Sequence, residues 1–323
     1  MHSITHAEAI VEAIFECMTE DDNIALVWGS LVGLGNQNEH ALRIQEKFPE
    51  RIFHPPISEA AICAMATGAA MDGIRTIFPM GTASFMFRAW DQIIHEAGAA
   101  HYMSNGKVKV PAVFHVVHGL RGGGSVQHSQ SPQAMLWNSP GIEIALPSCP
   151  SDAKGLMRTA IKSDNPTVFI DHQKLNSLKG EVPDEPYDVP FGKADVKRGG
   201  TDVTIVAASL QVIHSLEAAE ILAAEGLEIE IVDLRSLVPL DEKTILNSVH
   251  KTQKLLVVDE CPPRCSLASE VISVVVEKAM DVLKAPPRRV NRLPVHVPAN
   301  TEMEAFLGPN TNRIVEAVKE ICS

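Results

Sequence analysis

The chain has 323 residues, of which 45% are hydrophobic and 21% are charged. This length suits about two domains of roughly 100–200 residues each, and the composition is that of an ordinary globular protein rather than a disordered or fibrous one. Its 40 acidic residues exceed the 28 basic ones and give a formal net charge of −12. This charge argues against nucleic acid as the main partner, because phosphate binding needs an excess of Lys and Arg.

The sequence shows neither a secretion signal nor a membrane-spanning segment. Its first 19 residues lack a basic start and are interrupted by Glu8, Glu12 and Glu16, which argues against a signal peptide. No apolar run approaches the roughly 18 residues that a spanning helix needs. The six cysteines are scattered along the chain, at Cys17, Cys63, Cys149, Cys261, Cys265 and Cys322. Scattered cysteines in a chain of this size indicate reduced thiols, so we expect a soluble, cytoplasmic protein with no membrane partner.

In the first half of the chain, short apolar runs alternate with helical patterns. A helix is predicted at 4–18, where Ser3 or Thr5 can cap the N-terminus and Glu8 follows Thr5 by three residues. Further helices are predicted at 58–71, 85–100 and 150–162, and strands at 23–28, 74–78, 112–118, 142–146 and 167–171. This alternation is typical of a parallel β-sheet with helices on both faces.

An acidic, proline-bearing segment interrupts the alternation. Residues 178–191 hold three prolines and four acidic residues with little periodicity, which is typical of a linker between domains. The alternation then resumes, with strands predicted at 202–207, 228–233 and 254–258 and helices at 210–225, 241–252, 267–283 and 312–321. The sequence therefore predicts an α/β protein with two parallel-sheet domains, at 1–178 and 192–323, joined by a linker at 179–191.

The sequence motifs of several common catalytic sites are absent. There is no GxxxxGK[ST] phosphate loop, no GxSxG elbow and no HExxH metal pair. The glycine run at 122–124 lacks the GxGxxG spacing of a dinucleotide fold, and Cys261-x3-Cys265 lacks the second cysteine pair of a zinc site. Any chemistry must therefore depend on isolated residues where loops meet helices.

The first such residue is Glu59, which follows two prolines and falls in the first turn of the helix predicted at 58–71. Ser58 can cap this helix, and the residues from Ala60 to Met71 are almost wholly apolar. An acidic residue here has an ordinary use, because it stabilises the helix dipole by roughly 0.3–1 kcal/mol. A carboxylate beside buried apolar surface can also share a proton with a nitrogen base. Glu59 is therefore a candidate for a catalytic or a structural role.

The second such residue is His128, in the segment Gln127-His128-Ser129-Gln130 just beyond the glycine run. Glycines allow a backbone to approach a ligand closely or to adopt positive φ. A histidine that follows such a loop is well placed for proton transfer. The alternative is an ordinary histidine of a surface loop.

Seven short motifs follow one another along the chain, namely Pro56-Ile57-Ser58-Glu59, Gly68–Arg75, Tyr102–Gly106, Gln127–Gln130, Pro140-Gly141, Ser151–Leu156 and Asp233-Leu234-Arg235. Together, and in this order, they resemble the β subunit of thiamine-diphosphate-dependent 2-oxo acid dehydrogenases. Three further segments resemble most closely the acetoin dehydrogenase branch, namely Gly180–Pro183, Val258–Glu260 and Pro263–Ser266. One motif alone would be weak, but the ordered set extends from about residue 4 to residue 320.

The resemblance implies a pyrimidine-binding, transketolase-like domain followed by a transketolase C-terminal-like domain. The glutamate matching Glu59 hydrogen-bonds N1′ of the thiamine aminopyrimidine, and the activated cofactor then supplies carbanion chemistry. Residues matching Ile57 and Phe85 contact the pyrimidine ring. The histidine matching His128 lies at the mouth of the active site, where it assists proton transfer or the hand-over to lipoyl-lysine.

The resemblance also implies partners and metal ions. Thiamine enzymes hold Mg²⁺ and the diphosphate with a Gly-Asp-Gly segment and a later asparagine, and Met71-Asp72-Gly73 here lacks that asparagine. The family's α subunit carries this half of the site in an α2β2 assembly, and a lipoyl-bearing E2 acyltransferase receives the acyl group from a small-molecule substrate. K⁺ is expected at main-chain carbonyls matching Ala112, Ala160, Ser163 and Asn165, although the last two also suit an ordinary helix stop before proline.

Some residues depart from the family pattern. Ser30 and Leu31 stand where the family usually has an acidic pair, and Pro79 and Arg88 also differ near the cofactor. Since the catalytic and cofactor-binding residues are retained, we predict the β subunit of an oxidoreductase E1 component that acts on acetoin or a 2-oxo acid. Two alternatives remain open. One is a split transketolase-type or carboligase subunit, which the departures favour, and the other is a non-catalytic assembly subunit.

Overall fold

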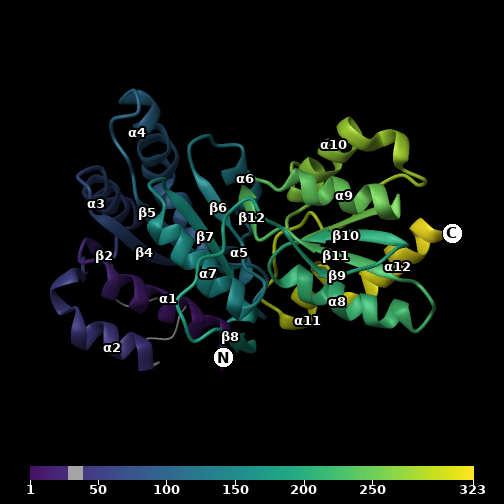
Figure 1. The fold of residues 1–323 in the computed structure, drawn as a ribbon, viewed down its shortest axis with the longest axis horizontal. Helices are drawn as coiled ribbons and strands as arrows, with labels where there is room; N and C mark the ends of the chain where they lie inside the picture. Colours follow the sequence, from purple (N-terminus) through teal and green to yellow (C-terminus); the bar gives the residue numbers. More distant parts are fainter. Residues whose placement is uncertain (28–38) are drawn as a thin grey trace.

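The computed structural model describes residues 1–27 and 39–323, which form two lobes built on one large β-sheet each (Figure 1). In the first lobe, seven of the described strands form a sheet in the order β12-β6-β7-β5-β4-β2-β3. These strands are β2 (Ile24–Val27), β3 (Ile52–Phe53), β4 (Arg75–Thr82), β5 (Ala112–His118), β6 (Glu143–Ala145), β7 (Thr167–His172) and β12 (Ser236–Val238). Neighbouring strands run parallel except at the edge, where β12 pairs antiparallel with β6. Ser30 and Leu31 lie outside the described residues.

Helices cover both faces of this sheet, as predicted. The helices are α1 (His6–Glu20), α2 (Glu39–Lys47) and α7 (Pro150–Lys162) on one face, and α3 (Glu59–Met71) and α4 (Gly98–Met103) on the other. Successive side chains of a strand point to opposite faces. Accordingly, Ile77 and Val113 pack with α1, α2 and α7, whereas their neighbours Phe78 and Phe114 pack with α3.

The second lobe contains a five-stranded sheet among the described residues, in the order β14-β13-β10-β11-β9. Its strands are β9 (Asp195–Arg198), β10 (Val203–Ala207), β11 (Ile229–Asp233), β13 (Leu255–Asp259) and β14 (Arg288–Asn291). Its helices are α8 (Leu210–Ala223) and α12 (Thr311–Cys322) on one face, and α9 (Glu242–Thr252) and α10 (Leu267–Ala279) on the other. The edge strand β9 is antiparallel to β11, so both predicted parallel sheets carry one antiparallel edge.

Most of the predicted elements are confirmed. Strand β5 and helix α7 coincide with the predicted ranges at both ends, and α1 begins at His6 after the predicted capping box. In that box the Glu8 N–H donates to Thr5 Oγ1, and the Thr5 N–H donates to Glu8 Oε2. Helix α10 ends at Ala279 rather than at residue 283, and a short 3₁₀ turn, Met280–Val282, follows it.

The prediction of one regular α-helix at 85–100 is wrong. Ala83–Ala89 is a 3₁₀-helix, Asp91–Ala97 is a π-helix, and only α4 beyond them has the regular winding. Hydrophobic spacing reports that a segment is helical, but it does not separate these windings over seven residues. The irregular winding matters because it carries Phe85.

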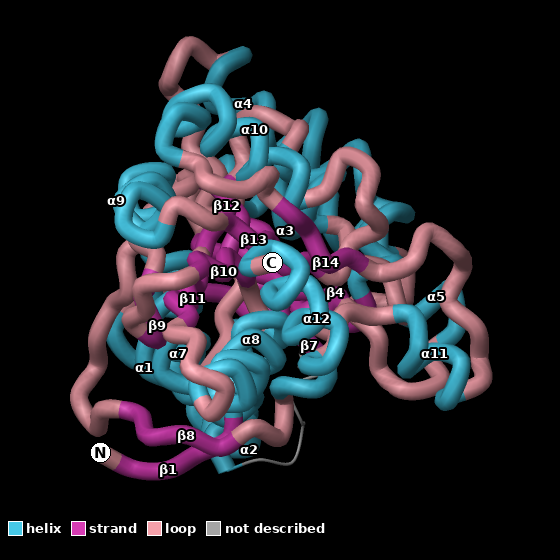
Figure 2. Tube along the Cα trace, turned by 90° about the vertical axis from the view of Figure 1, so that its right-hand side faces the viewer, coloured by secondary structure: helices cyan, strands magenta, loops and turns pink. Residues whose placement is uncertain are grey.

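The predicted linker at 179–191 is not free of structure, because it begins with strand β8 (Lys179–Val182). This strand pairs antiparallel with β1 (His2–Thr5), and Figure 2 shows the pair at the edge of the molecule. The two lobes are also joined through β12, which comes from the second half of the chain and extends the first sheet. One hydrophobic cluster contains residues of both sheets, so the lobes share part of their core.

Short elements that the sequence analysis did not predict connect the larger ones, namely Pro49–Arg51, α5 (Ser125–His128), α6 (Gln133–Trp137), Gln173–Leu175 and α11 (Thr301–Leu307). Helix α11 contacts the glycine run directly before α5, although the two helices belong to different halves of the chain, and Figure 2 shows both on the right-hand side. None of the helices in the described ranges is long and apolar enough to cross a membrane. All six cysteines are free.

Candidate active site

Glu59 begins helix α3, at the position that the sequence predicts. Ser58 is the N-cap residue, but its side chain makes no capping hydrogen bond. Glu59 is only 7% exposed, and its carboxylate has no hydrogen bond or ion pair with the residues at 1–27 or 39–323. Neither carboxylate oxygen is among the fully buried, unpartnered side-chain atoms of the described residues, so the carboxylate keeps some contact with solvent. This carboxylate is thus available to a donor from outside the chain.

Phe85 and His128 lie together in a cluster that we call the His128 cluster, made of Thr82, Phe85, Arg121 and His128. The ring centroids of Phe85 and His128 are 5.4 Å apart, in an edge-on arrangement that suits aromatic rings. His128 Nδ1 is 3.4 Å from Thr82 Oγ1, and Arg121 Nη1 donates to the same oxygen at 3.3 Å. His128 itself is exposed, so it can reach a molecule that enters from solvent.

The predicted site residues come from adjacent elements. Helix α3, which starts with Glu59, packs against the 3₁₀ segment that carries Phe85, through a shared hydrophobic cluster. Ile57, directly before α3, is 77% exposed, so its apolar side chain faces solvent. Of the residues that depart from the family pattern, Arg88 is exposed and Pro79 is buried in β4.

The loop that leads to His128 is held by side chains of the second lobe. The carboxylate of Glu304, on α11, accepts hydrogen bonds from the N–H groups of Gly122 at 2.5 Å, Gly123 at 2.6 Å and Gly124 at 3.2 Å. Further along the chain, Arg292 Nη1 donates to the carbonyl of Ser129 at 3.0 Å. The sequence analysis missed Glu304 and Arg292, because nothing in their local sequence distinguishes them from other surface charges.

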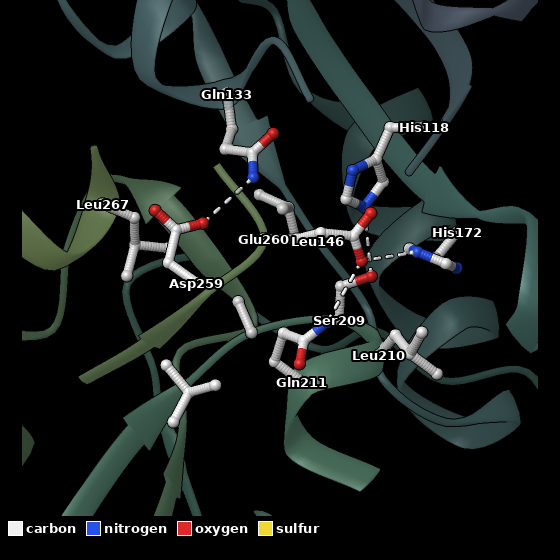
Figure 3. A pocket seen from close by; sticks show the side chains of 12 residues that line it. His118, Gln133, Leu146, His172, Ser209, Leu210, Gln211, Asp259, Glu260 and Leu267 are labelled. Atoms are coloured by element: carbon white, nitrogen blue, oxygen red, sulfur yellow. Dashed lines mark hydrogen bonds and ion pairs between the residues drawn. The ribbon is translucent and has the colours of Figure 1, made fainter. Parts of the chain in front are cut away.

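A third contact from the second lobe is centred on the buried Glu260 (Figure 3). Its carboxylate accepts from His172 Nε2 at 2.9 Å, from the Leu120 N–H at 2.6 Å and from Gln211 Nε2 at 3.1 Å. Burial tends to raise the pKa of Glu260, but the charge and hydrogen bond of His172 outweigh it and hold that pKa well below its ordinary value. Burial lowers the pKa of the nearby His118 to about 3, so that imidazole is neutral at physiological pH.

The cavity beside Glu260 is too small to hold a substrate. Its volume is about 10 Å³, which is at most room for one water molecule. Side chains of both lobes line it, including His118 and Gln133 from the first and Ser209 from the second. We therefore interpret it as part of a polar joint between the lobes, next to the loop that carries His128.

The structure offers few ligands for a metal ion. No group of three or more His, Cys, Asp or Glu side chains suited to a metal occurs within residues 1–27 and 39–323. Asp72, whose sequence segment lacks the asparagine of a complete Mg²⁺ motif, caps the C-terminal end of α3, whereas Glu59 lies at the other end. Asp72 and Glu59 thus lie a whole helix apart.

The carbonyls expected to bind K⁺ lie near the C-terminal end of α7, apart from that of Ala112 at the start of β5. There Arg75 Nη1 donates to the carbonyl of Ser163 at 2.8 Å, and Arg75 Nη2 donates to Asp164 Oδ1 at 2.9 Å. A guanidinium group therefore already supplies positive charge to these helix-end carbonyls. The K⁺ site at Ala112, Ala160, Ser163 and Asn165 stays a prediction.

Comparison with family models defines the class of the protein. Residues 2–177 match the pyrimidine-binding domain of transketolase, and residues 192–314 match the transketolase C-terminal domain. These domains, on two α/β lobes, characterise the thiamine-diphosphate-dependent transketolase-like enzymes. The chain between the two matches contains β8 and the rest of the segment at 179–191.

Full-length relatives narrow the class to a family. The chain is 35% identical to the β subunit of acetoin:2,6-dichlorophenolindophenol oxidoreductase of Bacillus subtilis, over 98% of this chain and 97% of that one. It is 37% identical to the protein of the same name from Cupriavidus necator, over 97% and 95%. It is 35% identical to the β subunit of the pyruvate dehydrogenase E1 component of Rickettsia felis, over 99% and 98%. The chain belongs to the family of the β subunits of thiamine-diphosphate-dependent 2-oxo acid and acetoin dehydrogenases.

Solved structures support the fold at lower sequence similarity. A split-gene transketolase, described as an inactive β4 tetramer, superposes with a TM-score of 0.79 at 23% identity, over 98% of both chains. The transketolase of Pichia stipitis gives a TM-score of 0.67 at 12% identity, and this chain corresponds to 46% of it. At these identities the similarity shows the fold alone. The family and the two-domain fold class that the motifs predict are thus confirmed.

Proposed function

We propose that this chain is the β subunit of a heterotetrameric, thiamine-diphosphate-dependent E1 component. The complex cleaves acetoin or a 2-oxo acid and transfers the acyl group to lipoyl-lysine of an E2 acyltransferase, in the cytoplasm. The observation that carries this proposal is Glu59, a residue only 7% exposed at the start of α3, whose carboxylate has no hydrogen bond or ion pair within the described chain. It lies on a helix that packs against the segment of Phe85, and Phe85 in turn contacts His128.

The residues present fit the pyrimidine end of thiamine diphosphate. Glu59 would hold a proton against the pyrimidine N1′, and Ile57 and Phe85 would contact the flat ring on its apolar surface. His128, exposed and next to Thr82 Oγ1, would move a proton to or from the substrate or the lipoyl acceptor. When bound, the cofactor supplies the carbanion chemistry that no side chain offers.

The same residues do not fit the diphosphate end. The N–H groups of Gly122–Gly124, which would suit an anion, are taken by the carboxylate of Glu304. The described chain has no carboxylate cluster for Mg²⁺. The proposal therefore assigns Mg²⁺ and the diphosphate to an α subunit, which would complete the site in an α2β2 assembly.

Cofactor binding should depend on that partner. In a calorimetric titration with thiamine diphosphate and Mg²⁺, we expect weak binding to this chain alone, because the pyrimidine contacts do not compensate for an unbound diphosphate. With an α partner present, binding should become tight, since the cofactor stabilises the assembled state by its differential affinity. Micromolar binding by a monomer of this chain alone would contradict the half-site.

The reaction product should separate the enzymatic alternatives. The complex reconstituted with its α partner and a lipoyl domain should convert acetoin or a 2-oxo acid into acyl-lipoamide, which mass spectrometry of the lipoyl domain detects. A ligated ketose or acyloin, with no acylated lipoyl domain, would instead indicate a split transketolase-type or carboligase subunit. Omission of E2 is the control, because the first reaction needs the lipoyl acceptor and carboligation does not.

A further inference from the structure

The carboxylate of Glu304 is bound by backbone groups alone. Glu304 is 1% exposed, and its two oxygens accept the three glycine N–H groups of the run at 122–124. Gly122 and Gly123 have φ of +85° and +94°, values that L side chains rarely adopt. Consecutive N–H groups in such a conformation form a concave anion site, or nest. In this chain the nest is filled by an internal carboxylate, 182 residues away from Gly122.

The nest lies in the short segment that joins β5 to His128. Strand β5 ends at His118, the glycine run follows, and α5 begins at Ser125 and ends at His128. The second lobe anchors this segment at several points. Glu260 holds the Leu120 N–H, Glu304 holds the glycines, and Arg292 holds the Ser129 carbonyl.

Of these anchors, Glu304 has the most direct effect on the placement of His128. Its contacts are charge-assisted, and such hydrogen bonds are stronger than neutral ones. The three N–H groups that donate to Glu304 lie immediately before α5. Glu260, in contrast, also accepts hydrogen bonds from the side chains of His172 and Gln211. The His128 ring, for its part, has only a 3.4 Å contact to Thr82 Oγ1 and the edge contact to Phe85 among the described residues. The backbone of the loop, rather than side-chain contacts, must therefore fix that ring.

We propose that Glu304 is a positioning residue for the active site, whose carboxylate in the glycine nest fixes the loop at 119–128 and thereby sets His128 against Phe85. A residue of the second lobe thus controls a reactive group of the first. The effect on the chemistry rests on the function proposed above, but the effect on the loop does not. The loop can therefore be tested by itself.

The test uses NMR of the full chain, with ¹⁵N-glycine and ¹³Cε1-histidine labels. In Glu304→Gln, which keeps the shape but removes the charge, the Gly122 and Gly123 amides should exchange with solvent at least ~10-fold faster. The His128 resonance should lose the shift caused by the Phe85 ring, while the amides of β5 keep their exchange rates. The matched control is Glu302→Gln, because Glu302 is exposed on the same helix. It should leave both signals unchanged.

A second variant changes the glycine backbone of the nest instead of the carboxylate. Gly123→Ala, at a φ of +94°, should strain the nest and shift the His128 resonance even where Glu304 is intact. Combined with Glu304→Gln, it should add little, since both changes break one contact. Full additivity of the two shifts, or an unchanged His128 resonance in Glu304→Gln, would overturn the proposal. In the reconstituted complex, Glu304→Gln should lower kcat by about 10-fold and leave the affinity for the cofactor unchanged. If the complexes of the natural chain and of the variant are both inactive, that result rejects only the proposed function.

Discussion

Replacing Glu59 by Gln should abolish turnover of the reconstituted complex, with a loss of roughly 10²–10⁴-fold in kcat, the range for a missing general acid or base. Gln keeps the length of the side chain, but it cannot share its proton with a ring nitrogen. The fold should not suffer. Glu59 is 7% exposed and its carboxylate has no hydrogen bond or ion pair within the described chain, so the substitution breaks no such contact, and a neutral amide is easier to bury than a charge. We therefore expect a melting temperature that is unchanged or higher, as is common where function opposes stability.

The control for this variant is Glu50→Gln, which neutralises an exposed carboxylate of the same lobe. Its kcat should equal that of the natural chain. Turnover by Glu59→Gln at the natural rate would leave this chain only a structural role in the complex, as a non-catalytic assembly subunit. Circular dichroism and the assembly state of both variants would exclude a trivial loss through misfolding.

Replacing Lys154 by Met should destabilise the chain by about 3–5 kcal/mol, the cost of breaking a buried ion pair by removing one partner. Lys154 is fully buried on α7, and its Nζ lies 2.5 Å from Glu12 Oε1 and 2.8 Å from Glu16 Oε1, both on α1. Without the ammonium group, two carboxylates face each other in the interface of these helices. Urea unfolding measures this change in the free energy of unfolding. Lys162→Met is the control, because Lys162 pairs with Asp188 on the exposed end of α7 and should cost under ~1 kcal/mol.

The pH dependence of stability gives an independent test of the ion pair between Lys154 and Glu12. Burial tends to raise the pKa of Glu12, but hydrogen bonds from His40, Lys154 and His2 outweigh it and lower the pKa from 4.5 to about 2. A lowered folded-state pKa stabilises the fold above the ordinary pKa, and this stabilisation disappears as the pH falls from 4.5 towards 2. The stability difference between the natural chain and Lys154→Met should therefore shrink over that window. Equal costs for the two lysine variants at neutral pH would contradict the buried pair.

The fold was predictable where one physical rule acts alone. Strand β5 is apolar except for His115 and His118, and α7 has proline at its first turn, so their ends follow from local sequence. The segment at 85–100 was predicted as helical but with the wrong winding, because hydrophobic spacing does not distinguish 3₁₀ and π turns from a regular helix over seven residues. Strand β8 was missed because four residues with a glycine and a following proline carry no visible period.

In the candidate site, too, local sequence predicts some residues and not others. Glu59 could be found because it starts an otherwise apolar helix, and a carboxylate there is locally unusual. Glu304 could not, because its role lies in contacts across the lobes, and sequence spacing does not report contacts of that range. The ordered motifs added what local physics lacks, namely the family. Even so, they indicated roles for Glu59 and His128 without showing what holds the loop between β5 and α5.

Strand β12 has a consequence for how such a chain can be divided or recombined. It is encoded in the second half, yet it forms the edge of the first sheet and satisfies one side of β6. A first half made alone, up to the segment at 179–191, would present β6 as an open edge with unpaired backbone groups, the kind of edge that promotes aggregation. Gene fragmentation or domain shuffling at that segment would therefore separate a sheet from its own border. The two halves should be inherited, expressed and folded as one unit.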